Sequence, residues 1–215
     1  MATLAATFNA ADKSAPGHYG PSQTALILLD FHSLVVYKAA GPKGPEALEV
    51  VAKMRTWAKS QGIQVIHGLV NINLTPFETC KDAERFTGQI IAALQSSSNA
   101  EEPAVLFEGG AGDDVTFMRR PGYISALKSP GLGEFLQKKG IKSLILTGLS
   151  TSGVVLRTAL AATDEEYVVT VLSDGCADPV QDVHDFLVAS IFPQRGYVTT
   201  ATEFQEGFSK RSGGN

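Results

Sequence analysis

The chain has 215 residues, of which 44% are hydrophobic and 19% charged, a composition typical of a globular protein and a length that suits one α/β domain. Its formal net charge of −4 gives no reason to expect nucleic acid or an anionic membrane as a partner. No apolar run approaches the roughly 20 residues that span a bilayer.

The first part of the sequence predicts an N-terminal lead-in segment followed by a buried strand. Residues 1–22 are rich in Ala, Ser and Gly, and we expect them to be loosely structured, ahead of a single domain over residues 23–215. Residues 24–30 (TALILLD) are a near-continuous apolar run, which is typical of a strand covered on both faces. Residues 42–62 then predict an amphipathic helix, and residues 63–70 predict a second strand.

The middle of the chain is the least regular part. Within residues 71–114 we expect one helix, over residues 83–94, and we expect this irregular segment to line the substrate pocket. A short strand over residues 115–118 then leads to two adjacent arginines, Arg119 and Arg120.

The central feature is an apolar run, residues 143–147, that leads into a small-residue elbow, Gly148-Leu-Ser-Thr-Ser-Gly153. A helix to Asp164 follows, because apolar and small residues recur there at helical spacing. A strand that ends in such a turn and opens a helix is where open parallel sheets bind ligands. Backbone N–H groups at the helix start can bind a carboxylate or an oxyanion. Val154, which opens the helix, offers no nucleophile.

The remaining segments continue the alternation of helices and strands. It predicts a three-layer α/β/α fold, Rossmann-like, around a mainly parallel sheet with right-handed crossovers. The further predicted elements are helices over residues 132–139 and 180–191 and from Thr202 onward, and strands over residues 167–173 and 197–200.

Asp30 is the leading candidate for chemistry, since it follows five consecutive apolar residues at the end of a strand. Partial burial would make it a plausible acid or base, while the alternative is a helix cap or a solvated loop acid. At most one of Arg119 and Arg120 is expected to face the mouth of the sheet, because they are adjacent. There it would pair with Asp30 or clamp a substrate carboxylate; the alternative is an ordinary surface arginine.

Other nucleophiles and cofactors are less favoured. Ser150, Thr151 and Ser152 need a base within hydrogen-bond reach, their spacing is not the G-x-S-x-G elbow, and helix capping suits Thr151 or Ser152 better. A cysteine in the position of Cys176 is more often a small buried core residue than a nucleophile, and Cys80 is less favoured still.

The four histidines show no metal-ligand spacing, and the glycine-rich turn at residues 109–112 is not a dinucleotide motif. We therefore expect no metal and no cofactor.

Several segments together resemble the isochorismatase-like hydrolase superfamily, which includes nicotinamidases, N-carbamoylsarcosine amidases and isochorismatases. The resemblance runs from about Thr24 to about Phe208. It depends on the order and spacing of five motifs, which are ALILLD at 25–30, RPGYISA at 120–126, GIKSLILTGLST at 140–151, VLRTA at 155–159 and DGCAD at 174–178, ahead of His184.

The resemblance implies an altered catalytic triad. Asp30 matches the family's aspartate, Arg120 takes the lysine position with Arg119 as the alternative, and Val154 takes the position of the cysteine. It also implies a cis peptide between Leu149 and Ser150. The metal-binding histidines of nicotinamidases have no counterpart after residues 63–70. Because valine cannot form a thioester, the usual cysteine amidase mechanism should be absent.

The resemblance implies an enzyme that acts on a small organic substrate by Asp30-centred acid/base chemistry, such as ether or enol hydrolysis, elimination or isomerisation. One alternative is a degenerate member that serves as a binding or assembly protein; another is a conventional C–N hydrolase that uses Cys176 or Ser152. We further expect a cytoplasmic homo-oligomer, a dimer or tetramer. The residues expected in catalysis are Asp30, Arg120 and Ser150, and those expected to contact substrate are Phe31, Arg119, Leu149, Thr151, Ser152, Gly153 and Val154.

Overall fold

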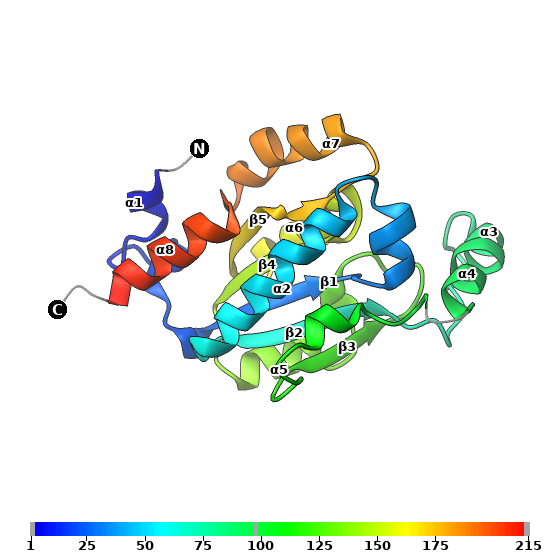
Figure 1. Ribbon diagram of the computed structural model, residues 1–215, viewed down its shortest axis with the longest axis horizontal. Coiled ribbons are helices and arrows are strands. Elements are labelled where there is room, and N and C mark those ends of the chain that lie inside the picture. The colour runs from blue at the N-terminus through cyan, green and yellow to red at the C-terminus, as the bar shows by residue number, and fades with distance from the viewer. Residues whose placement is uncertain (1–2, 97–98, 213–215) are drawn as a thin grey trace.

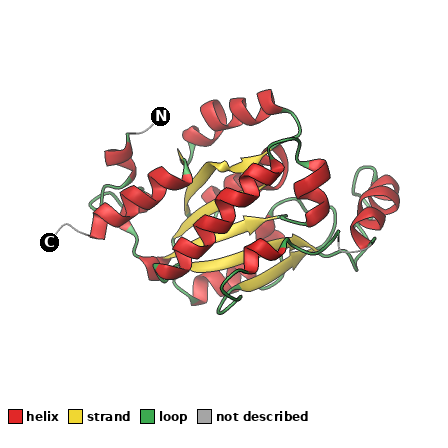
Figure 2. Ribbon diagram, viewed as in Figure 1, coloured by secondary structure: helices red, strands yellow, loops and turns green. Residues whose placement is uncertain are grey.

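The computed structural model describes residues 3–96 and 99–212, and the predicted three-layer architecture is confirmed (Figures 1 and 2). Six parallel strands form one sheet in the order β3-β2-β1-β4-β5-β6. The chain order reverses between β1 and β4, so the carboxyl ends of these two strands flank the crevice where such sheets bind ligands. The strands are β1 (Thr24–Leu29), β2 (Gln64–Val70), β3 (Val115–Arg119), β4 (Ser143–Leu149), β5 (Val168–Ala177) and β6 (Tyr197–Thr199).

Helices cover both faces of the sheet. On one face α2 and α8 pack over β1 and β5, and on the other α5 and α6 pack over β1 and β4 (Figure 1). The α-helices are α1 (Leu4–Thr7), α2 (Gly44–Ser60), α3 (Ala83–Arg85), α4 (Ala92–Gln95), α5 (Leu132–Lys138), α6 (Leu156–Asp164), α7 (Gln181–Phe186) and α8 (Ala201–Ser212). Short π-helical segments occupy Val35–Ala39, Phe86–Ile91, Thr151–Val155 and Leu187–Ile191. Short 3₁₀-helices occupy Pro16–His18, Pro21–Gln23, Ala104–Phe107, Ala126–Lys128 and Phe192–Gln194.

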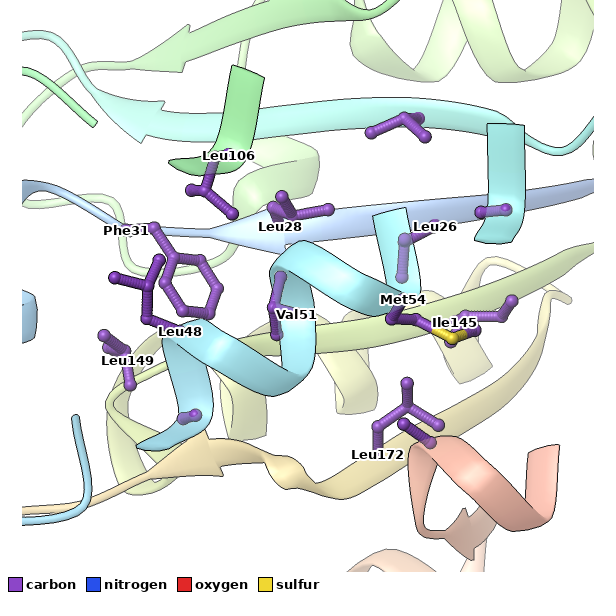
Figure 3. Packing of buried hydrophobic residues seen from close by; sticks show 14 of the residues in the cluster. Leu26, Leu28, Phe31, Leu48, Val51, Met54, Leu106, Ile145, Leu149 and Leu172 are labelled. Carbon is purple, nitrogen blue, oxygen red and sulfur yellow. The ribbon is translucent and has the colours of Figure 1, made fainter. Parts of the chain in front are cut away.

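Strand β1 is buried along its whole length because both faces are covered, which explains its unbroken apolar sequence. Figure 3 shows the core between α2 and the sheet, where Leu26 and Leu28 of β1 face Val51 and Met54 of α2. No helix within residues 3–96 and 99–212 is long and apolar enough to cross a membrane.

Two predicted features differ from the structure. The lead-in is packed rather than loose, since the ring of Phe8 lies 5.3 Å from that of Phe204 in α8, edge to face. Strand β5 runs on to Ala177, beyond the predicted end at residue 173, and its pairing with β4 shifts register between Leu146 and Gly148. The irregularity keeps Asp174-Gly-Cys-Ala in the sheet and brings Cys176 beside Gly148.

Candidate functional site

Asp30 lies directly after β1, at the carboxyl edge of the sheet. Its φ of 57° is in the left-handed region, which aspartate tolerates better than most residues and which often occurs at functional sites. Its N–H donates to the carbonyl of Gly68 in β2 at 3.0 Å. The residue is 8% exposed, so its carboxylate is held at a fixed position with limited contact to water.

Arg119, the last residue of β3, reaches across β2 to Asp30. Its Nη1 donates to Oδ1 of Asp30 at 2.9 Å and its Nη2 donates to Oδ2 at 2.5 Å, so the pair is bidentate. Its Nε donates to the carbonyl of Tyr123 at 2.9 Å, and the whole residue is only 3% exposed. A guanidinium fork of this kind is the strongest common way to fix a carboxylate.

The structure differs from the prediction at Arg120. Its side chain points away from Asp30: Nε donates to the carbonyl of Thr75 at 2.8 Å and Nη2 donates to that of Pro76 at 3.0 Å. Since successive side chains of a strand point to opposite faces, only one of the two arginines reaches the site, and it is Arg119. Arg120 instead binds the segment that follows β2.

The elbow after β4 carries the cis peptide that the resemblance implies, between Leu149 and Ser150. Its N–H groups are less available than expected. The N–H of Ser152 donates to Oδ2 of Asp178 at 2.8 Å, and that of Gly153 donates to the carbonyl of Ser150 at 3.2 Å. These two groups therefore stabilise the turn rather than bind a ligand.

A cavity of about 430 Å³ opens above Asp30 and Arg119, within the size range of small-molecule sites. Of the residues predicted to act on or contact substrate, six line it together. One of them is Val154, the residue that the resemblance aligns with the cysteine. The residues that line the cavity include Asp30, His32, Cys80, Lys81, Phe86, Ile90, Leu94, Arg119, Tyr123, Ile124, Leu149, Ser150, Gly153 and Val154.

Three predicted contact residues lie elsewhere. Phe31 is fully buried in the core beneath α2, beside Leu48 (Figure 3). Thr151 is also fully buried, and its Oγ1 lies 2.8 Å from Nδ1 of His184, which fastens the elbow to α7. Burial lowers the pKa of His184 and so favours the neutral ring. Ser152 is exposed to solvent outside the cavity.

The expectation that residues 71–114 line the pocket holds in part, for five residues between positions 80 and 94. Two of them, Cys80 and Lys81, lie on a loop. The other three, Phe86, Ile90 and Leu94, belong to the helical segment over residues 83–95, which we call the outer helix. Figure 1 shows this run, labelled α3 and α4, beyond the carboxyl ends of the strands. The sequence reasoning did not single out these residues, although the four-residue spacing of the last three is a readable signal of a helix face.

The two cysteines differ in burial and in their position relative to the cavity. Cys176 is 4% exposed and does not line the cavity, and burial raises the pKa of its thiol to about 12, which disfavours the reactive thiolate. Cys80 lines the cavity, where its Sγ lies 3.6 Å from the carbonyl of Lys81. In the described part of the chain, no group of three or more His, Cys, Asp or Glu side chains is arranged to hold a metal ion.

Comparison with known proteins agrees with this fold. A family model described as the isochorismatase domain matches residues 24–203. A cysteine hydrolase from Pseudomonas syringae pv. phaseolicola has a similar structure, with a TM-score of 0.75 and 20% identity over 90% of this chain and 95% of that one. An isochorismatase family protein from Burkholderia thailandensis has a TM-score of 0.69 and 22% identity, with 87% and 96% covered.

A third similar structure is the N-carbamoylsarcosine amidase from Thermoplasma acidophilum, with a TM-score of 0.66 and 15% identity over 83% of this chain and 96% of that one. Identities this low show a shared fold and no more. A search of curated proteins gave no match.

Proposed function

The chain belongs to the isochorismatase family, and we propose that it is an enzyme that acts on a small organic substrate through Asp30, without a cysteine nucleophile. Arg119 takes the role of the family's lysine beside Asp30, and Val154 takes the place of the cysteine. The family is one of hydrolases; the mechanism in this chain is our proposal.

The observation that carries the proposal is the buried Asp30–Arg119 pair at the base of a ligand-sized cavity. Because a guanidinium does not give up its proton, the pair favours an ionised carboxylate. Asp30 therefore begins the reaction as a base that removes a proton from the substrate. Eliminations and isomerisations begin in this way, so they suit the geometry best. Ether or enol hydrolysis requires Asp30 to acquire a proton first and then to donate it.

Arg119 contributes more than the position of Asp30. Three of its five N–H groups are used, two by Asp30 and one by Tyr123. Since Arg119 also lines the cavity, a remaining N–H is suited to bind a substrate oxygen on which negative charge develops.

A conventional nucleophile is disfavoured. Ser150 lines the cavity, but no described side chain forms a hydrogen bond to its hydroxyl and could serve as its base. His32 lines the same cavity with both ring nitrogens in use: Nδ1 lies 2.6 Å from the carbonyl of Ala100, and Nε2 accepts from the N–H of Val70 at 3.4 Å. Ser152 and Cys176 lie outside the cavity.

The proposal is tested by turnover of a substrate panel that separates the reaction classes. We expect activity on an enolisable 2-oxo acid such as phenylpyruvate, measured as its tautomerisation. The vinyl ether isochorismate, measured as pyruvate release, tests the hydrolytic alternative. We expect none above background on the amides nicotinamide and N-carbamoylsarcosine. Hydrolysis of the amides alone would contradict the proposal, because it would indicate a displaced nucleophile.

A second candidate is a binding protein that keeps the cavity without catalysis. It is favoured by the engagement of both carboxylate oxygens of Asp30, which leaves fewer lone pairs to accept a substrate proton. Ligand binding with no turnover anywhere in the panel would favour this candidate. Homo-oligomer formation and a cytoplasmic location stay predictions; exposed apolar side chains along α7, among them Phe186, support the first.

A further inference from the structure

The charges that line the cavity do not cancel. Asp30 and Arg119 neutralise each other in their bidentate pair. Both ring nitrogens of His32 are engaged: Nδ1 lies 2.6 Å from the carbonyl of Ala100, and Nε2 lies 3.4 Å from the N–H of Val70. Lys81 remains, and no carboxylate within residues 3–96 and 99–210 forms an ion pair with it. Among the described residues that line the cavity, Lys81 is therefore the charged side chain that has no ion-pair partner.

The rest of the wall is largely apolar. Phe86, Ile90 and Leu94 are spaced four residues apart, so they lie on one face of the outer helix. Ile90 is 45% exposed, and Tyr123 and Ile124, which line the same cavity, are 42% and 45% exposed. Exposed large apolar side chains that gather around one cavity are typical of a ligand site, because an apolar ligand removes them from water.

The loop that carries Lys81 is fastened to the end of β3 through residues 75–77. Arg120 binds the carbonyls of Thr75 and Pro76, and the ring of Phe77 lies 5.1 Å from that of Tyr123. Gly122 permits this contact: its φ is +94°, and a Cβ there would lie 2.7 Å from the ring of Phe77. Adjacent arginines thus hold two parts of one site, Arg119 the carboxylate of Asp30 and Arg120 the loop of Lys81.

We propose that the ligand of this cavity is a small, mainly apolar molecule with a single anionic group, which Lys81 binds while the outer helix and Tyr123 cover the apolar part. The inference rests on the proposed function for the identity of the site and adds the class of substrate. An anion at Lys81, at the rim, directs the other end of the molecule toward Asp30.

Isothermal titration calorimetry of the full chain with three probes tests the proposal. The probes are 3-phenylpropionate, its neutral amide 3-phenylpropionamide, and propionate, which keeps the anion and lacks the ring. We expect the acid to bind about fivefold more tightly than the amide, the upper range for a partly exposed ion pair. We expect propionate to bind more weakly than either, because it covers little of the apolar wall.

Two variants separate charge from apolar contact. Lys81→Gln should weaken binding of the acid about fivefold and leave the amide unchanged. Ile90→Ser should weaken acid and amide together, by about tenfold. Lys138→Gln is the matched control: it removes the same charge from an exposed position on α5 outside the cavity, and both affinities should stay as they are.

Equal affinity of the unaltered chain for acid and amide would overturn the proposal, as would an acid preference that persists in Lys81→Gln or no binding of the acid at millimolar concentration. The measurement needs no turnover, so the two proposals fail separately. A chain that prefers the acid but turns over nothing keeps this inference and loses the enzymatic one. A chain that turns over substrate but shows no preference for the anion keeps the enzymatic proposal and loses this inference.

Discussion

Replacement of Asp30 by Asn is expected to lower turnover by about 10²- to 10⁴-fold, the usual contribution of a positioned general acid or base. Asn is nearly isosteric and can still accept a hydrogen bond from Arg119, but it cannot take a proton from the substrate. The loss should therefore appear in kcat, with substrate binding affected less. Steady-state kinetics on whichever substrate of the panel is turned over measures it.

Folding of the variant has to be measured alongside, because Asn leaves the buried charge of Arg119 without its counter-ion. A thermal melt with a single cooperative transition would show that the loss is chemical. Asp164→Asn, at an exposed position at the end of α6, is the control and should keep full activity. An Asp30→Asn protein that folds and turns over at the normal rate would remove Asp30 from the mechanism.

Replacement of Asp114 by Ala is expected to destabilise the fold by about 3–5 kcal/mol, the cost of breaking a buried ion pair from one side. Asp114 lies just before β3, and its Oδ2 accepts from Nε of Arg55 at 2.6 Å, while its Oδ1 accepts from Nζ of Lys59 at 2.7 Å. Arg55 is 1% exposed, so without Asp114 its guanidinium would stay buried and uncompensated. Urea denaturation measures the change in the free energy of unfolding.

The neighbouring residue is a matched control for this effect. Asp113 also faces Lys59, at 3.4 Å, but its side chain is 83% exposed, and such pairs contribute between about 0 and 1 kcal/mol. Asp113→Ala should therefore be close to neutral. Equal effects of the two substitutions would mean that the ion pair of Asp114 contributes no more than a surface contact.

The same cluster connects the segment after the outer helix to the site. Arg55 donates to the carbonyl of Gly110 at 2.7 Å, and His67 of β2 lies 2.8 Å from Glu102 through its Nδ1. Directly before Glu102, the carbonyl of Glu101 accepts from the N–H of Ser33, near Asp30. Loss of Asp114 should thus weaken the segment that contacts the chain just after β1.

The fold was predictable because its strands are buried on both faces. Continuous apolar runs such as residues 24–29, separated by helical periods, leave few alternatives to a parallel sheet between helices. The position of Asp30 follows from the same pattern, since a polar residue that ends a buried strand lies at the edge where strands deliver ligand-binding side chains.

The choice between the two arginines was also predictable. The resemblance placed Arg120 first and Arg119 as the alternative, and the structure pairs Arg119 with Asp30. Along β3, Val115 and Phe117 are half-buried while Thr116 and Met118 are exposed. The alternation continues to a buried Arg119 and an exposed Arg120. Family spacing favoured Arg120, whereas the two-residue period of the strand indicates Arg119.

Other parts of the site depend on contacts that no local pattern encodes. The outer helix can be inferred from its spacing, but its place over the cavity depends on Arg120 and Phe77, which hold the preceding loop. Phe31 follows Asp30 directly and yet points into the core, because the left-handed backbone at Asp30 redirects the chain. Side-chain direction after such a residue is set by tertiary packing.

The most direct test of the account uses a chain without thiols. Cys80 and Cys176 are the only two cysteines in the sequence, so Cys80→Ser/Cys176→Ala removes every possible thiol nucleophile. The measurement is kcat of this variant on the substrate that the unaltered chain turns over, with and without Asp30→Asn added. We predict that the thiol-free variant has a kcat within a few-fold of that of the unaltered chain. We predict that this activity is lost when Asp30→Asn is added. Loss of activity in a folded, thiol-free chain that still has Asp30 would contradict the account, because it would show that a cysteine carries the reaction.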